Sequence, residues 1–406
     1  MSQDRVIEAD SNDTYPAQTV KMIFVAILVC HVAVDALAAL LPSTLGLLEV
    51  RLSMTPKQSA WLLGMGSLFS GLAQPICAFV SDRLSTRQLA VFGMLLSALG
   101  IGSLGLAGGL VSLTLIYAVG MIGVGMFHPV GAATIGELRR HARTSAVSIF
   151  FVSGMVGGVA GAFLWPRLLS SATGFQWLPM TMVFGLLLVI FLQRNISLLA
   201  PVHVAKHNLS DQSAPKIEWA MMAILYTAAA VRFSVNMALL YLYVRWAEGC
   251  VLAEHQDWSP GQVATAAAPL VGNFNAATLI GMALGGVFAG LLIRPGKEKW
   301  PMVLVPIGFA PLIGWFPYAP LEISYLLAVA GGIGFASMIP VSIAFAQHLM
   351  PRHTNLASGL MMGGAWSIAV IGPRCAEIGV AQLGMPITFV LTAIALALSG
   401  IISIRL

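Results

Sequence analysis

The segment Ile122-Gly-Val-Gly-Met-Phe-His-Pro-Val130 returns 211 residues later as Ile333-Gly-Phe-Ala-Ser-Met-Ile-Pro-Val341, with the two prolines in register. Two shorter matches occur in the same order at offsets of 201 and 204 residues: His31-x-x-x-Asp35 with Arg232-x-x-x-Asn236, and Thr55-Pro56-Lys57-Gln58 with Ser259-Pro260-Gly261-Gln262. Internal repeats are a common way to build a large helical membrane protein. The sequence therefore predicts two homologous halves that face each other and enclose a central cavity.

The composition places these halves in a lipid bilayer. Of the 406 residues, 58% are hydrophobic and only 9% are charged, whereas about 25% of the residues in a soluble protein are charged. Each crossing of the hydrocarbon core needs about 20 apolar residues, and the apolar runs are continuous rather than alternating as in a membrane barrel. The sequence therefore predicts an all-α membrane protein of twelve transmembrane helices in two pseudo-symmetric six-helix bundles.

Charged or turn-rich stretches divide the apolar runs into two sets of six. The expected spans are 21–48, 58–80, 88–107, 110–136, 145–166 and 176–192, followed by 217–246, 262–293, 301–318, 321–349, 356–382 and 385–404. Residues 193–216 form a long polar stretch, which predicts a cytoplasmic linker between an N-terminal bundle (21–192) and a C-terminal bundle (217–406). Residues 1–20 predict a cytoplasmic tail, because their acidic character does not fit a cleaved signal peptide.

The lysine and arginine residues give the orientation, because they collect in cytoplasmic loops. With both termini inside, fifteen of the 21 lie on the cytoplasmic side and four lie outside. Both termini are therefore expected in the cytoplasm. The same bias explains the formal net charge of +5 without a nucleic-acid partner.

The loop after the second span, Ser81-Asp82-Arg83-Leu84-Ser85-Thr86-Arg87, resembles the signature G-x-x-x-D-R-x-G-R of the major facilitator superfamily. Asp82 and Arg83 match it, whereas Ala78 and Ser85 stand where glycines are usual, and the second-half loop 290–297 lacks the aspartate. The resemblance covers residues 20–406 and implies a carrier that works by alternating access. It also implies gating by Asp82, Arg83 and Arg87, with helix kinks at Pro129 and Pro340.

Within that superfamily the chain is most similar to fosmidomycin-resistance-type efflux proteins. The matching segments are Cys30-His31-x-x-x-Asp35, Gln74-Pro75, Phe127-His128-Pro129 and Ser148-Ile149-Phe150-x-Val152-x-Gly154. This similarity implies export from a bacterial cell across the inner membrane, and it says little about the substrate.

Charged residues inside the spans are the first candidates for a functional site, because each costs about 2.5–3.5 kcal/mol at a helix centre. Asp35 lies fourteen residues after Lys21, near mid-membrane, and His31 lies one turn earlier on the same face. Arg232 and Asn236 occupy matching depths in the seventh span, so Asp35 and Arg232 are expected to neutralise each other across the cavity. Two interpretations stay open: a structural ion pair that locks the halves, or a switch whose proton affinity changes as the cavity opens.

His128 precedes Pro129 in the fourth span, where the proline disturbs the backbone hydrogen bonds. The histidine either bonds a freed carbonyl, or it lines the cavity opposite His31 as a proton relay or substrate contact. The second half has Ile339 at the matching place, so the kink itself does not require a histidine. This asymmetry favours the functional role. His31 has the same two interpretations, coupling or a bond to a carbonyl.

Other polar residues in the spans form a second tier. Gln74, Asn273 and Asn275 either bind substrate or tie helices together. Arg374 and Glu377, three residues apart in the eleventh span, are expected near the external surface, either as a gate or as a surface pair. The small residues Gly154, Gly157, Gly158 and Gly161 of the fifth span predict close helix packing.

The sequence contains no nucleotide-binding loop and no catalytic motif, so it predicts a protein that is not an enzyme and needs no cofactor. It predicts a monomeric secondary transporter, coupled to protons, that exports a small organic or drug-like molecule. Its partners are that substrate, protons and the lipid bilayer. The alternatives are an uptake symporter, a divalent-metal exporter that uses His31, Asp35 and His128, and a non-transporting receptor. A nearby Arg232 would argue against the metal.

Overall fold

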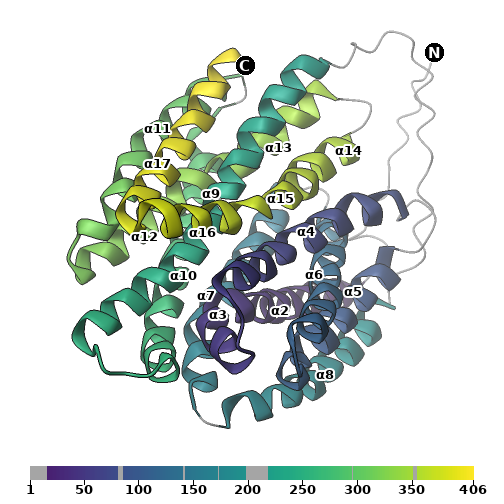
Figure 1. Ribbon diagram of the computed structural model, residues 1–406. Helices are drawn as coiled ribbons and strands as arrows, with labels where there is room; N and C mark the ends of the chain where they lie inside the picture. Colours follow the sequence, from purple (N-terminus) through teal and green to yellow (C-terminus); the bar gives the residue numbers. More distant parts are fainter. Residues whose placement is uncertain are drawn as a thin grey trace, which may run out of the picture.

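Nearly all of the described chain is helical in the computed structural model (Figure 1). The structure describes residues 16–80, 86–139, 142–171, 173–197, 218–294, 296–350 and 354–406, without the side chains of 78–80, 86–87, 143–144 and 354–355. Within these ranges, twelve helical segments are long and apolar enough to cross a bilayer. The expected all-α class with twelve membrane helices is confirmed.

The first half of the chain supplies six of these spans. They are α2 (Ala17–Ala38) with α3 (Leu40–Arg51), α4 (Pro56–Val80), α5 (Thr86–Gly102), α6 (Leu110–Leu138), α7 (Arg143–Leu169) and α8 (Leu178–Ile196), with the 3₁₀ turns η1 (Leu104–Leu106) and η3 (Gly174–Trp177). The first helix begins at Ala17 rather than at residue 21, directly after Pro16. Lys21 does not end the span, because a lysine near a helix end can extend its amine to the membrane surface.

The first span is interrupted at Ala39, one turn after Asp35, and kinked at Thr44. Pro42 has no N–H to bond the carbonyl of Ala38, and α2 ends at that residue. Thr44 has non-helical angles (φ −121°, ψ 18°), and its hydroxyl donates to the Leu40 carbonyl at 2.8 Å. The change in helix direction at Thr44 lies nine residues beyond Asp35, towards the far end of the span.

The second half supplies the other six spans. They are α9 (Trp219–Glu254), α10 (Pro260–Leu292), α11 (Lys299–Trp315) with η4 (Phe316–Tyr318), α12 (Leu321–Ala336) with α13 (Met338–Leu349), an eleventh span made of α14 (Thr354–Gly359), the π-helical turn η5 (Leu360–Gly364), α15 (Ala365–Ile368) and α16 (Ile371–Leu383), and α17 (Met385–Ile402) with η6 (Ser403–Arg405). The two prolines of the repeat behave differently. The helix breaks at Ser337 before Pro340, whereas α6 continues through Pro129.

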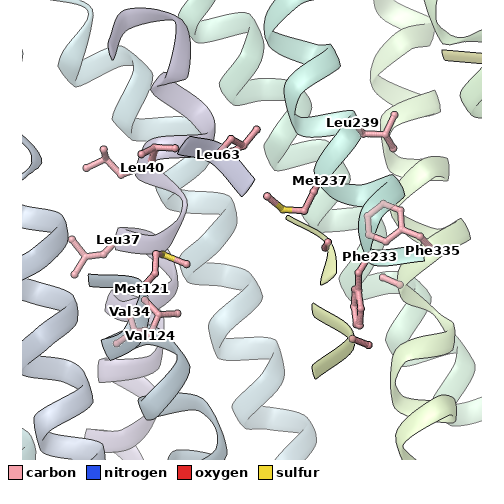
Figure 2. Close-up of a cluster of buried hydrophobic side chains, with 14 of the residues drawn as sticks. Val34, Leu37, Leu40, Leu63, Met121, Val124, Phe233, Met237, Leu239 and Phe335 are labelled. Atoms are coloured by element: carbon pink, nitrogen blue, oxygen red, sulfur yellow. The ribbon is translucent and has the colours of Figure 1, made fainter. Parts of the chain in front are cut away.

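Figure 1 shows the two bundles side by side, α2 to α8 in purple to teal and α9 to α17 in green to yellow. The apolar core runs through both bundles, and Figure 2 shows part of it, with Val34 and Val124 in the first bundle and Phe233 and Phe335 in the second. Because the number of spans is even, α2 begins and α17 ends on the same side. We call this the terminal side and the opposite one the far side.

The halves are joined by polar contacts in the part of the molecule towards the far side. The side-chain amide of Asn275 in α10 donates to Ser43 Oγ in α3 at 3.3 Å. Arg167 Nη2, near the end of α7, donates to Asn273 Oδ1 in α10 at 2.8 Å. These bonds cross between the bundles and join residues more than 100 positions apart in the chain, so they hold the two halves together rather than stabilising either one.

Glycines allow the closest helix approaches, as the small-residue face of the fifth span predicts. A Cβ atom on Gly157 or Gly161 of α7 would collide with the backbone of Val32 or Ala36 in α2. In the second half, a Cβ on Gly281 would collide with the backbone of α12 in the same way. The α2–α7 contact matters most for function, because it fixes the helix that carries Asp35.

Gly157→Ala should lower the free energy of unfolding by about 1–3 kcal/mol, because its Cβ meets rigid backbone and α7 must move away from α2. Gly158→Ala is the matched control, since its Cβ meets the flexible side chain of Leu279 at 3.2 Å. The measurement is the unfolding of the purified protein in detergent. An equal decrease in the free energy of unfolding in the two variants would contradict this packing.

Candidate functional site

Asp35 lies between two histidines near the middle of the first bundle. α2 carries His31 and Asp35 one turn apart, and α6 presents His128 to the same carboxylate. His128 Nε2 lies 3.0 Å from Asp35 Oδ1, and His31 Nε2 lies 3.5 Å from Asp35 Oδ2. The two imidazole rings meet edge to face, 4.9 Å apart. We call these three residues the His–Asp–His cluster.

The second nitrogen of each histidine is held by a backbone carbonyl. His31 Nδ1 lies 2.8 Å from the carbonyl oxygen of Phe150, and His128 Nδ1 lies 2.7 Å from that of Val124. A carbonyl oxygen only accepts hydrogen bonds, so each Nδ1 carries the proton and donates it. In a neutral imidazole the other nitrogen, Nε2, then has a lone pair. Both Nε2 atoms therefore present lone pairs to a carboxylate unless a further proton is bound between them.

His128 bonds the disturbed backbone through Nδ1 and faces the carboxylate through Nε2. His31 does the same, with the difference that its Nε2 is buried and makes no hydrogen bond. The Asp35 carboxylate therefore contacts both histidines. The role of His128 as a proton relay or substrate contact stays a prediction.

The walls of the cluster are apolar and closely packed. The ring of Phe150 stacks on His31 with centroids 3.7 Å apart, and Phe127 lies 5.9 Å from the same imidazole. A Cβ on Gly154 of α7 would collide with the Asp35 carboxylate, so the cluster requires a glycine at this position. The side chain of His31 is 1% exposed, whereas those of Asp35 and His128 are 15% and 19% exposed. Solvent therefore reaches the cluster only through Asp35 and His128.

Arg232 does not pair with Asp35, contrary to the expectation from helix depth. Its Nη2 donates to Ser342 Oγ in α13 at 3.0 Å, within its own bundle. Asn236, one turn later in α9, is buried as well. Equal depth in two spans does not determine the direction in which side chains point. Arg232 points into the second bundle, at the place that the repeat assigns to His31 in the first.

The second-tier residues lie where helices meet. Asn273 and Asn275 take part in the contacts between α10 and the first bundle. Gln74 is half-buried in α4, next to Gly363 of η5, where α4 crosses the eleventh span. Their positions agree with the interpretation that they tie helices together.

A metal ion would also find ligands in the His–Asp–His cluster. The two Nε2 atoms and a carboxylate oxygen lie within 4.8 Å of one another, and the histidines are oriented by carbonyls as in many metal sites. Because Arg232 lies outside the cluster, its charge is no argument against such a site.

Comparison with known proteins identifies the family. The sequence profile described as Major Facilitator Superfamily matches residues 23–325. The chain belongs to the major facilitator superfamily. It is 25% identical over 366 residues to the uncharacterized MFS-type transporter YfnC of Bacillus subtilis (88% of this chain, 86% of the relative) and 23% identical over 374 residues to the fosmidomycin resistance protein of Escherichia coli (91% and 89%).

Solved structures share the fold of this superfamily member. The nucleoside transporter NupG matches with a TM-score of 0.71 and 12% identity, covering 94% of this chain and 99% of that one. The peptide transporter POT matches with a TM-score of 0.69 and 16% identity, covering 96% and 94%. At these identities the likeness concerns the fold alone.

The gating residues implied by the superfamily resemblance are only partly visible. Asp82 and Arg83 lie outside the described residues, and of Arg87 only the helical backbone in α5 is described. Arg374 and Glu377 form an ion pair on one face of α16. This pair stays within a single helix.

One charged group that joins the halves of this transporter was missed by sequence reasoning. Arg245 of α9 binds Glu49 of α3 with two bonds, 3.1 and 2.5 Å long, and lies 3.0 Å from Glu248. Glu49 also accepts a bond of 2.6 Å from Ser59 of α4. The sequence could indicate only the pair Arg245 and Glu248, which are three residues apart. It could not indicate Glu49, which is 196 residues from Arg245. We call Glu49, Arg245 and Glu248 the far-side ion cluster.

Arg245→Gln should open the far side, because the two carboxylates lose the cation between them, at a cost of about 3–5 kcal/mol. The measurement is the labelling rate of Ser43→Cys, in a background without the four native cysteines, by a maleimide that does not cross the membrane. Ser43 is 1% exposed, so labelling should be slow before and faster after the substitution. Arg374→Gln is the control, since its pair joins no halves, and equal rates in the two variants would rule out a gating role.

Proposed function

We propose that this superfamily member is a proton-coupled secondary transporter that exports a small organic solute, with the His–Asp–His cluster as the proton site. The observation that carries the proposal is the orientation of the two histidines. Both Nδ1 atoms donate to carbonyls, so both Nε2 atoms present acceptors to one carboxylate. Without a bound proton, the carboxylate and the two Nε2 lone pairs repel one another. One bound proton turns this repulsion into a hydrogen bond.

The bound proton has a defined place. The separation of 3.0 Å between His128 Nε2 and Asp35 Oδ1 is that of a charge-assisted hydrogen bond. Loss of this proton leaves a carboxylate facing two lone pairs among aromatic side chains, which is costly in a site that is mostly buried. Deprotonation therefore favours a conformation in which water reaches Asp35. This links proton binding to the opening and closing of the cavity.

The contacts between the halves support alternating access. Towards the far side, the far-side ion cluster and the bonds of Asn275 and Arg167 close the gap between α3, α7, α9 and α10. The charge bias of the loops assigns the terminal side to the cytoplasm. On this assignment these bonds close the outer side of the interface between the bundles.

Export rather than import is supported by the likeness to the fosmidomycin resistance protein, which covers 91% of this chain. At 23% identity, the substrate of that relative cannot be assigned to this protein. The direction is therefore part of the proposal, and the experiment below has to report it.

Asp35→Asn should abolish transport driven by a proton gradient while leaving the protein folded and some downhill exchange intact. The new amide N–H can donate to the lone pair of His128 Nε2, so the variant resembles the protonated state permanently. The measurement uses purified protein in liposomes with a trapped pH indicator, a compound panel and both gradient directions. Asp257→Asn, an exposed carboxylate outside the cluster, is the control.

Three outcomes would contradict the proposal. Gradient-driven transport at the normal rate in Asp35→Asn would exclude this carboxylate as the proton site. Transport of Zn²⁺ without proton movement would assign the cluster to a metal. Absence of flux for every compound, with a folded protein, would favour a receptor.

A further inference from the structure

Arg232 carries a charge that no acidic side chain neutralises within the described part of the chain. The residue is 2% exposed and lies about 20 Å along α9 from Trp219, at about 1.5 Å per residue. Its Nη2 donates to Ser342 Oγ, while its Nη1 is buried and makes no hydrogen bond. A guanidinium has five N–H donors that match the oxygens of carboxylate and phosphate groups. The donors on Nη1 are unused.

A small cavity lies beside this guanidinium. Its volume is about 10 Å³, enough for a single atom the size of a water oxygen. Three elements enclose it, α9, α13 and η5, through Ala229, Arg232, Phe233, Ile339, Ser342 and Met361. The only polar side chains in this lining are Arg232 and Ser342. A neutral molecule in the cavity would satisfy a donor and leave the charge uncompensated.

The wall formed by Met361 is adaptable. This residue lies in η5, a π-helical turn, and such turns are frequent at functional sites. Methionine side chains are flexible and fit ligands of different shape. A change in the Met361 side chain would therefore enlarge the space beside Arg232.

The internal repeat gives the cavity a counterpart in the first bundle. Arg232 matches His31, and Ile339 of the lining matches His128. In the first bundle this place holds its own carboxylate, Asp35. In the second bundle Asn236 stands at the position of that carboxylate, so the negative charge is missing.

We propose that Arg232 and Ser342 bind the oxyanion group, a carboxylate or a phosphate, of the solute that this protein transports. One oxygen of the group takes the cavity and accepts from Nη1. The hydroxyl of Ser342, which donates to Met302 Sδ at 3.9 Å in the unliganded protein, turns to donate to a second oxygen. This inference rests on the proposed function only in identifying the ligand as the transported solute. The anion site itself does not depend on proton coupling.

The test is thermal melting of the purified full-length protein in detergent, at constant ionic strength, with acetate, inorganic phosphate, chloride or acetamide as probes. Acetate or phosphate should raise the melting temperature saturably, whereas acetamide, which has the same shape without the charge, should not. The shift should disappear in Arg232→Gln, shrink in Arg232→Lys and Ser342→Ala, and persist in Arg374→Gln. The last variant is the control, since that arginine is already paired with Glu377.

Several results would overturn the inference. A shift that persists in Arg232→Gln would show a general effect of anions on the protein surface. Equal shifts with chloride would show a halide site, and no shift with either oxyanion would leave Arg232 without a ligand role. Without added anion, Arg232→Gln should melt no lower than the parent protein, because it removes an uncompensated buried charge; a clear loss would assign the arginine a structural role. Should that variant not fold, Ser342→Ala gives the same comparison.

The outcome is separable from that of the proposed function. The melting assay has no proton gradient, so a positive result together with failed proton coupling would contradict only the coupling. A negative result together with intact coupling at Asp35 would contradict only the anion site.

Discussion

A carboxylate in the middle of a membrane protein must be neutralised by the protein itself, and Asp35 meets this requirement through two histidines rather than through an arginine. The carbonyls of Phe150 and Val124 fix the imidazoles so that their Nε2 atoms face it. An arginine would hold the carboxylate ionised at any physiological pH, because its own proton does not leave. Histidines gain and lose protons near neutral pH. In the mechanism we propose, this choice of partner makes the site responsive to protons.

The two halves share a fold and differ in what they place at equivalent positions. His31 corresponds to Arg232, Asp35 to Asn236 and His128 to Ile339. The first bundle therefore contains a carboxylate paired with two histidines, whereas the second contains an arginine without a counter-charge. A symmetric pair of charges would have formed a bridge and resisted separation of the halves. The asymmetry leaves Asp35 paired with two histidines and Arg232 without a counter-charge.

Much of this arrangement could be predicted from local sequence. Hydropathy gave the twelve spans, and helical spacing placed His31 and Asp35 on one face. The partner of Asp35 could not be predicted, because depth in two spans leaves the direction of each side chain open, and Arg232 turns towards Ser342. The bond between Glu49 and Arg245 was equally hidden, since it joins residues 196 positions apart.

In the mechanism proposed, proton and solute influence each other through the interface between the bundles, not by sharing atoms. The proton site touches α7 at Gly154, and α7 packs against α10 of the other half. The anion cavity touches η5 at Met361, and η5 packs against α4 of the first half. A change at either site therefore bears on a helix that crosses the interface. Because coupling between binding sites is reciprocal, the factor by which the proton alters solute affinity equals the factor by which the solute alters proton affinity. Proton binding at Asp35 and anion binding at Arg232 are therefore coupled when the two halves move as rigid bodies, although the sites share no atoms.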